Sequence, residues 1–226
     1  MSALIDTWSK DASEEDTMTD EHAFIWDRMI ACIPSKDIRD EKVLDFGCNQ
    51  GGFLRLLYDS RPFASGVGVD LAQTAVAMAE QRKGNRPLRY LATDNLADLG
   101  TEFDRAFSHE VIYLIDDLEA HAKDIFAALK PGGTYDAVTC CHADSPLWAT
   151  WRPMIAEFSN IPVPNHSVAD ITEAFRSAGF EVTVSRFMAD AFIPCLGSNA
   201  YFPSDVDRIE TYTQWKLSFR GTRPQV

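Results

Sequence analysis

The fold is decided by the stretch Val43-Leu44-Asp45-Phe46-Gly47-Cys48-Asn49-Gln50-Gly51-Gly52-Phe53. An apolar run ends at Asp45, glycine-rich chain follows, and apolar residues at helical spacing resume from Phe53, which predicts a strand, a tight turn and a helix. Because glycine has no Cβ, Gly47 and Gly51 let the backbone approach a bound molecule closely, and the first N–H groups of the helix remain available to it. The stretch therefore predicts a ligand-binding turn; the alternative is an ordinary strand-to-helix turn of an α/β domain.

The glycine spacing distinguishes this turn from two common phosphate-binding turns. Gly47-x-x-x-Gly51-Gly52 is not the G-x-G-x-x-G of dinucleotide folds, and no Lys-Ser/Thr pair follows as in a P-loop. The turn resembles the first motif of class I S-adenosylmethionine-dependent methyltransferases, Asp/Glu-x-Gly-x-Gly-x-Gly, at Asp45, Gly47 and Gly51. Asn49 replaces the middle glycine, and asparagine is the non-glycine residue that best tolerates left-handed backbone.

Two further predicted strands, 64–70 and 88–94, also end in acids, Asp70 and Asp94. The resemblance implies that Asp70 accepts the ribose hydroxyls and that Asp94 accepts the adenine amino group, with the backbone N–H of the next residue facing the ring. The alternatives are a solvated strand end for Asp70 and a helix cap for Asp94. The implied cofactor is S-adenosyl-L-methionine, and its expected contacts are Asp45, Phe46, Gly47, Cys48, Asn49, Gly51, Asp70, Leu71, Asp94, Asn95, Ser108 and His109.

A fourth strand is predicted at 103–108, and the segment after it, 108–114, resembles the post-strand segment of the family. This places His109, Glu110 and Tyr113 near the methyl donor, because ligands of open α/β sheets gather at the carboxyl ends of the strands. If the acceptor needs a general base, His109 and Glu110 are the candidate catalytic residues.

Other polar residues are weaker candidates for catalysis. His142 and His166 are further possible bases, and the alternative for each base candidate is a packed or solvent-facing side chain. Ser108 lacks the G-x-S-x-G context of a nucleophilic serine. His121 is expected on the outward part of an amphipathic helix.

The alternation of strands and helices predicts an α/β fold with a doubly wound, mostly parallel sheet. The resemblance adds seven strands in the order 3-2-1-4-5-7-6, with the last one antiparallel, in a Rossmann-like methyltransferase fold. Lys130-Pro131-Gly132-Gly133 predicts a helix stop and a turn into a strand at 135–140, and Ser167-Val168-Ala169-Asp170 predicts a capping box. The final helix is expected from Asp205 to about Thr213, and the final strand at 215–220.

The domain prediction is a leader and cap helix over residues 1–40 and a cofactor-binding methyltransferase domain over 41–226. The leader extends to about Asp20, and Trp8 is large enough to fold back onto other parts. The segments 141–166 and 188–204 have no sustained period and are predicted to be lids. An aromatic lid favours a small, partly apolar acceptor, and the residues expected to bind it are Tyr113, His142, Trp148, Trp151 and His166.

Charge and cysteine usage narrow the class of protein. A net charge of −13 argues against a nucleic-acid partner, since binding a polyphosphate requires Lys and Arg. Five cysteines without a C-x-x-C pair predict free thiols and no metal site, and no apolar run is long enough for a membrane span, so a cytoplasmic location is expected. Whether the protein is a monomer or a homodimer stays open.

The sequence thus predicts an S-adenosylmethionine-dependent methyltransferase that acts on a small molecule through an O, N or C atom. One alternative is a protein that binds the cofactor without catalysing a reaction. The other is an NAD(P)-dependent oxidoreductase on a related sheet, which the missing G-x-G-x-x-G disfavours. An aromatic face for the positively charged sulfur is expected from Phe46, Tyr113, Trp148 or Trp151.

Overall fold

The computed structural model describes residues 12–100, 103–159 and 161–225, and Trp8 lies outside them. A seven-stranded sheet has the order β3-β2-β1-β4-β5-β7-β6. β1 is parallel to β2 and β4, β2 is parallel to β3, and β7 is antiparallel to β5 and β6, which confirms the predicted fold class. The strands are β1 (Ile38–Phe46), β2 (Phe63–Asp70), β3 (Leu88–Ala92), β4 (Phe103–His109), β5 (Leu129–Thr139), β6 (Glu181–Arg186) and β7 (Leu217–Thr222).

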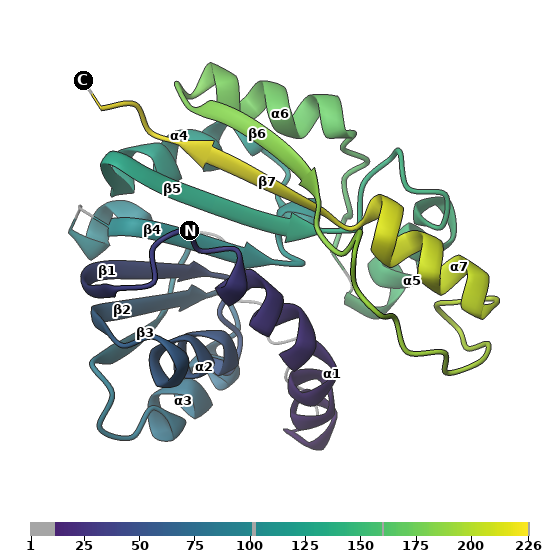
Figure 1. Ribbon diagram of the computed structural model, residues 1–226, viewed down its shortest axis with the longest axis horizontal. Coiled ribbons are helices and arrows are strands. Elements are labelled where there is room, and N and C mark those ends of the chain that lie inside the picture. The colour runs from purple at the N-terminus through teal and green to yellow at the C-terminus, as the bar shows by residue number, and fades with distance from the viewer. Residues whose placement is uncertain (1–11, 101–102, 160, 226) are drawn as a thin grey trace. The chain divides into compact units, whose positions relative to one another are not determined.

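Helices connect most of these strands (Figure 1). They are α1 (Ala12–Ala31), α2 (Gly52–Ser60), α3 (Gln73–Arg82), α4 (Leu118–Ala128), α5 (Trp148–Ser159), α6 (Val168–Ser177) and α7 (Asp205–Glu210). Short helical turns occupy Leu96–Leu99, Ile112–Leu114 and Thr211–Trp215, and the last of these is a π-helix. Within the described ranges, none of the helices has both the length and the apolar character that crossing a bilayer requires.

The chain divides into two compact units. The first comprises Met1–Phe107 with Ala128–Lys130, and the second comprises Ser108–Ala127 with Pro131–Val226. In the first unit, α2 buries Phe53, Leu54 and Leu57, because these residues share one face of the helix. This packing fixes the helix that follows the glycine-rich turn.

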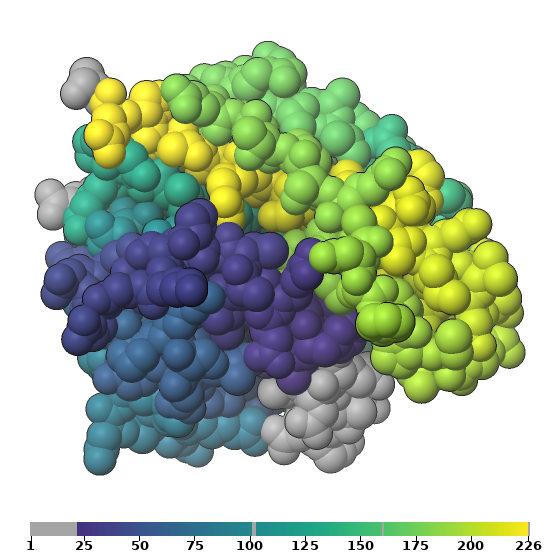
Figure 2. Space-filling model, viewed as in Figure 1, coloured from purple at the N-terminus to yellow at the C-terminus, as the bar shows by residue number. Residues whose placement is uncertain are grey.

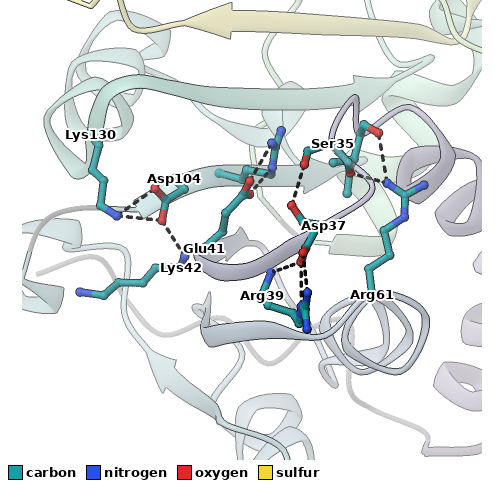
Figure 3. Close-up of polar contacts among 10 residues, drawn as sticks. Ser35, Asp37, Arg39, Glu41, Lys42, Arg61, Asp104 and Lys130 are labelled. Carbon is teal, nitrogen blue, oxygen red and sulfur yellow. Dashed lines mark hydrogen bonds and ion pairs between the residues drawn. The ribbon is translucent and has the colours of Figure 1, made fainter.

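Polar contacts fix the beginnings of strands in the first unit (Figure 3). The Arg105 guanidinium bonds the Glu41 carboxylate at 2.5 Å, and the Lys130 ammonium lies 2.8 Å from Asp104. Asp104 also accepts the backbone N–H of Lys42 at 2.7 Å. These contacts join β1 to β4 and to Lys130. They do not involve the carboxyl ends of the strands, where the glycine-rich turn and Asp70 lie.

The second unit confirms the predicted capping box. The Ser167 hydroxyl accepts the Asp170 backbone N–H at 3.1 Å, and the Asp170 carboxylate accepts the Ser167 backbone N–H at 2.8 Å, so α6 begins at Val168. The helix ends where predicted, before Gly179, whose φ of +105° few other residues adopt.

Two expectations about helix boundaries are wrong. The helix predicted around His22–Ile30 begins at Ala12, inside the expected leader. The final helix α7 ends at Glu210 and continues as a π-helix to Trp215, which delays the last strand to Leu217.

The expected turn at Lys130–Gly133 is also wrong, although the helix stop before it is confirmed. β5 begins at Leu129, directly after α4, and includes these four residues. The Gly132 N–H donates to the Arg223 carbonyl at 2.8 Å, and the Arg223 N–H donates to the Gly133 carbonyl at 2.8 Å. Pairing with the C-terminal chain therefore extends the strand through the glycines.

The first predicted lid contains a helix, α5, that sequence periodicity did not indicate. The N–H groups of Thr150 and Trp151 both donate to the Leu147 carbonyl at 3.0 Å, so the first turn forms before Pro153. Proline removes one backbone donor, which a helix tolerates most easily near its start. The second irregular segment, 188–204, contains no helix or strand, and Figure 2 shows it at the surface in yellow-green.

Candidate functional site

The glycine-rich turn has the unusual backbone that its sequence predicts. Gly47, Asn49 and Gly51 have φ of +79°, +46° and +73°. The N–H groups of Gly47 and Cys48 donate to the Val69 carbonyl at 2.8 and 3.0 Å, which joins the turn to the end of β2. Asn49 thus adopts the left-handed conformation that its position at the middle glycine requires.

Asp70 joins the two loops that meet at the ends of β1 and β2. One carboxylate oxygen accepts the Asn49 N–H at 2.8 Å, and the other accepts the Ala72 N–H at 2.9 Å. Burial raises the pKa of Asp70, while these backbone N–H groups oppose the rise. The carboxylate is therefore held in a fixed orientation beside the turn.

Asp45 is the most unusual group of the first unit. It is 4% exposed, and burial, with the nearby charge of Asp70, raises its pKa to about 8. Among the described residues, none donates a hydrogen bond to its carboxylate, and no Lys or Arg forms an ion pair with Asp45 or Asp70. Two acids without a counter-charge suit a cationic ligand, because such a ligand would stabilise their ionised forms.

The other expected cofactor contacts of the first unit surround this pair or follow β3. Phe46 and Cys48 are buried, and burial holds the pKa of the Cys48 thiol well above its usual value. β3 ends at Ala92, so Asp94 lies exposed in the loop after it. The helix-capping role considered for Asp94 belongs to Asn95, whose side-chain oxygen accepts the Ala97 N–H at 3.2 Å. Leu71 follows Asp70 and is half-buried.

Ser108 belongs to the second unit, and its hydroxyl is part of a buried network. It hydrogen-bonds the Tyr135 hydroxyl at 2.8 Å, which in turn bonds the His121 ring at 3.0 Å. The expectation that His121 faces outward is wrong, because its spacing from Leu118 and Ile125 places it on the buried face of α4. Burial lowers the pKa of His121 to about 4.

Glu110 is held by a buried lysine. The Lys216 ammonium lies 2.6 Å from its carboxylate, Thr139 donates to the other oxygen at 2.6 Å, and the Cys140 N–H adds a third bond at 3.2 Å. Glu110 has a φ of +53°, which costs energy for a residue with a side chain. These contacts hold the segment that contains His109 in place.

Glu110 and Lys216 strongly favour each other's charged forms. Burial opposes charge on both groups, yet the Lys216 cation holds the pKa of Glu110 well below its usual range, and Glu110 raises that of Lys216. Because a base needs a pKa near the working pH, the geometry does not favour the predicted catalytic role of Glu110.

A group of possible metal ligands adjoins this pair. One ligand atom each from Glu110, Cys140 and Cys141 lies within 4.8 Å of the others. The Glu110 carboxylate already carries the Lys216 ammonium as its counter-ion, so a metal ion would have to displace a buried cation. The chemistry of the site therefore favours the ion pair over a metal.

The structure brings three of the expected substrate residues together in one buried apolar cluster. Tyr113 and Trp148 meet edge to face at 5.7 Å, and Trp151 belongs to the same cluster with Cys140, Cys141 and Val163. The Trp148 indole donates to Asn165 at 3.0 Å, and the Trp151 indole donates to the Tyr201 carbonyl at 2.7 Å. The aromatic residues thus belong to one core, in which both indole N–H groups have acceptors.

The two expected substrate histidines hydrogen-bond backbone carbonyls. His142 Nε2 donates to Trp215 at 2.9 Å, and His166 Nε2 donates to Ile115 at 2.7 Å. Because a carbonyl only accepts, Nε2 carries the proton in each ring. His142 is fully buried, and its Nδ1 lies 3.8 Å from the Asp144 carboxylate.

Sequence reasoning missed Lys216, Tyr90 and Arg55 as supports of these sites. Lys216 is 106 residues from Glu110, and nothing in the local sequence indicates their pairing. Tyr90 has a detectable signal, because it is an aromatic residue in a buried strand that pairs with Gly68. Its contacts with the glycine-rich turn are described below.

The strand order and the acid-bearing turn after β1 define a class I S-adenosylmethionine-dependent methyltransferase fold. Residues 18–184 match the family model described as a methyltransferase domain, and the chain belongs to this family. This membership agrees with the methyltransferase class that the sequence predicted and disfavours the nicotinamide alternative.

Curated relatives share only part of their length with this chain. An uncharacterized protein of Haemophilus influenzae is 29% identical over 53% of this chain and 51% of its own length. A malonyl-[acyl-carrier protein] O-methyltransferase of Enterobacter lignolyticus is 30% identical over 56% of this chain and 49% of its own length. The chain therefore spans about half the length of these relatives.

Solved structures resemble the chain over more of its length. A chain from a complex between the Haloferax volcanii Trm112 methyltransferase activator and a methyltransferase is 25% identical, with a TM-score of 0.82 and 97% coverage of both chains. An S-adenosylmethionine-dependent methyltransferase from Mesorhizobium loti is 18% identical, with a TM-score of 0.65 and coverage of 86% and 96%.

Proposed function

We propose that the turn from Asp45 to Gly51, with Asp70, binds S-adenosylmethionine in the first unit. The observation that carries this proposal is the buried acid pair without a counter-charge. The cofactor supplies an electrophilic methyl group on a positively charged sulfur, and its cationic charge suits such a pair. By resemblance to the family, Asp70 accepts the ribose hydroxyls and Asp94 the adenine amino group.

Binding measurements test this assignment. Calorimetry with S-adenosylmethionine, S-adenosylhomocysteine and NADPH should give heat with the first two ligands only. Asp70→Ala should lose the ribose contact and the anchoring of Asn49, and so weaken binding by about a hundredfold. Asp124→Asn on the exposed side of α4 is the matched control and should bind normally. Unchanged affinity in Asp70→Ala would refute this placement of the cofactor.

We propose a small, partly apolar methyl acceptor. The net charge of −13 disfavours nucleic acid, and the cluster around Tyr113 and Trp148 concentrates apolar side chains in the second unit. Two curated relatives are malonyl-[acyl-carrier protein] O-methyltransferases, so a carboxyl group on an acyl chain is a specific candidate. A radiolabelled methyl-transfer screen of malonyl thioesters beside a metabolite pool tests this acceptor. A cytoplasmic location stays a prediction.

If the acceptor needs a base, His109 is the stronger candidate. The Glu110 carboxylate is paired with the Lys216 ammonium, whereas His109 precedes Glu110 and carries an imidazole, the side chain that most often serves as a general base. His109→Gln should lower turnover at least tenfold and leave cofactor affinity within twofold. Equal turnover in this variant would remove His109 from catalysis, and no turnover by any variant or the parent would favour the non-catalytic alternative.

A protein partner is a second possibility. The Haloferax structure that matches 97% of this chain comes from a complex with an activator protein. We propose that this chain binds a small activator of that kind. Size-exclusion chromatography of the chain mixed with purified Trm112 tests it, and separate elution of the two proteins at micromolar concentration would refute it.

A further inference from the structure

Tyr90 of β3 reaches the glycine-rich turn through its hydroxyl group. The side chain is buried, and its hydroxyl donates to the Gly51 carbonyl at 3.1 Å across 39 residues of sequence. Gly51 is the residue immediately before α2 and has left-handed backbone with φ of +73°. The hydrogen bond therefore acts on the last residue of the turn.

The Tyr90 ring fills the space that side chains at two glycines would need. A Cβ on Gly51 would lie 2.5 Å from the Tyr90 ring, and a Cβ on Gly68 would also lie 2.5 Å from it. Gly68 is paired with Tyr90 in the β2–β3 register. Gly51 and Gly68 thus make room for a tyrosine of the protein itself.

Arginine side chains hold the neighbouring part of the turn. Arg55 donates to the Gln50 carbonyl at 2.5 Å. Arg82 donates to the Gln50 side-chain oxygen at 2.5 Å. The carbonyls of Gln50 and Gly51 are consecutive, so side chains fix both peptide groups that end the turn.

We propose that Tyr90 is a positioning residue that holds the turn from Asp45 to Gly51 in its cofactor-binding conformation. Glycine is conformationally permissive, and left-handed backbone is strained for a residue such as Asn49, so a turn with Gly47, Asn49 and Gly51 in this conformation needs support from its surroundings. Tyr90 supplies a ring that supports the backbone and a hydroxyl that orients the Gly51 peptide. The proposal rests on the cofactor site proposed above.

Removing only the hydroxyl tests the proposal. Tyr90→Phe keeps the ring and should weaken binding of S-adenosylmethionine and S-adenosylhomocysteine about fivefold, the equivalent of one neutral hydrogen bond. Calorimetry is done at a temperature where circular dichroism finds every variant folded. A purely structural role would lower the melting temperature and leave the affinity of the folded protein unchanged.

Tyr58→Phe is the matched control. Tyr58 lies on α2 with its ring 5.2 Å from Phe63, and its hydroxyl makes no hydrogen bond with the described residues. Its affinity for the cofactor should equal that of the parent. A Tyr90→Phe affinity within twofold of the parent would overturn the inference. No binding by the parent would instead overturn the cofactor site, and the inference with it.

A glycine pair tests the role of the ring. Gly51→Ala and Gly84→Ala both place a side chain on left-handed backbone, with φ of +73° and +61°, but the nearest atom to a Gly84 Cβ is 3.5 Å away. Gly51→Ala should weaken cofactor binding more than about tenfold, whereas Gly84→Ala should leave it unchanged. Equal affinities in the two variants would contradict the proposed support by Tyr90.

Discussion

The two units of this member of the methyltransferase-domain family place acidic side chains in opposite electrostatic environments. In the first unit, Asp45 and Asp70 lie close together without a cation from the described residues, and burial raises the pKa of Asp45 to about 8. In the second unit, Glu110 is half-buried, and Lys216 holds its pKa well below the usual range. The environments differ mainly in whether a counter-charge is part of the protein.

This difference separates a binding role from a structural one. When a carboxylate already forms an ion pair within the protein, a cationic ligand adds little electrostatic stabilisation. When a buried carboxylate has no counter-ion, a bound cation supplies one and stabilises the ionised form. The proposed recognition of the sulfonium cofactor therefore rests on the unpaired acids, and we propose that Glu110 stabilises the chain around His109. The predictions below test each half of this comparison.

The largest change in stability is expected when the ion pair between Lys216 and Glu110 is broken. Lys216→Met leaves the Glu110 carboxylate buried without its cation and should lower the free energy of unfolding by about 3–5 kcal/mol in urea titrations. Glu110→Gln with Lys216→Met should recover part of this loss, because neither charge then remains buried. Lys123→Met, from an exposed pair with Glu119, should cost at most about 0.5 kcal/mol. Similar losses in Lys216→Met and Lys123→Met would contradict the comparison.

Asp45→Asn should change the stability of the protein and its affinity for S-adenosylmethionine in opposite directions. Removing the buried acid should weaken S-adenosylmethionine binding by about 2 kcal/mol, or about thirtyfold, because the charge that favours the cation is lost. The same change should raise the melting temperature of the ligand-free protein. The parent should also release a proton on binding the cofactor near pH 7, measured as a dependence of calorimetric heat on the buffer, and the variant should not.

The sign of the stability change follows from linkage. The pKa of Asp45 is about 8 in the folded protein and 3.8 as the ordinary value, so the unfolded chain loses its proton first as the pH rises. The parent therefore loses stability between about pH 4 and pH 8 relative to Asp45→Asn. A lower melting temperature in the variant at pH 7 would mean that the carboxylate is compensated after all.

The sequence predicts the fold well because its signals are local. The turn at Asp45–Gly51 and the strand ending at Asp70 follow from apolar runs and glycines, and the capping box at Ser167 follows from spacing over four residues. The sheet order came from resemblance to the family, since periodicity does not determine which strands pair.

The missed features depend on contacts between distant residues. α5 is hidden by Pro153 and a tryptophan-rich sequence, and the partnership of Lys216 with Glu110 has no local signal. The sequence does place Asp45 at a strand end, but its raised pKa depends on burial and on Asp70, which only the folded chain brings together. The roles of the expected cofactor and substrate residues remain predictions.

The smallest effect concerns the buried network of His121, Tyr135 and Ser108, which has no net charge when His121 is neutral. Burial lowers the pKa of His121 to about 4 from 6.5, so the unfolded chain binds a proton first as the pH falls. Stability from this residue is full above about pH 6.5 and declines as the pH falls toward 4. Melting curves of the parent and His121→Leu should therefore converge in acid. His166→Gln serves as the comparison. A parallel pH profile for the parent and His121→Leu would show that His121 remains accessible to protons in the folded protein.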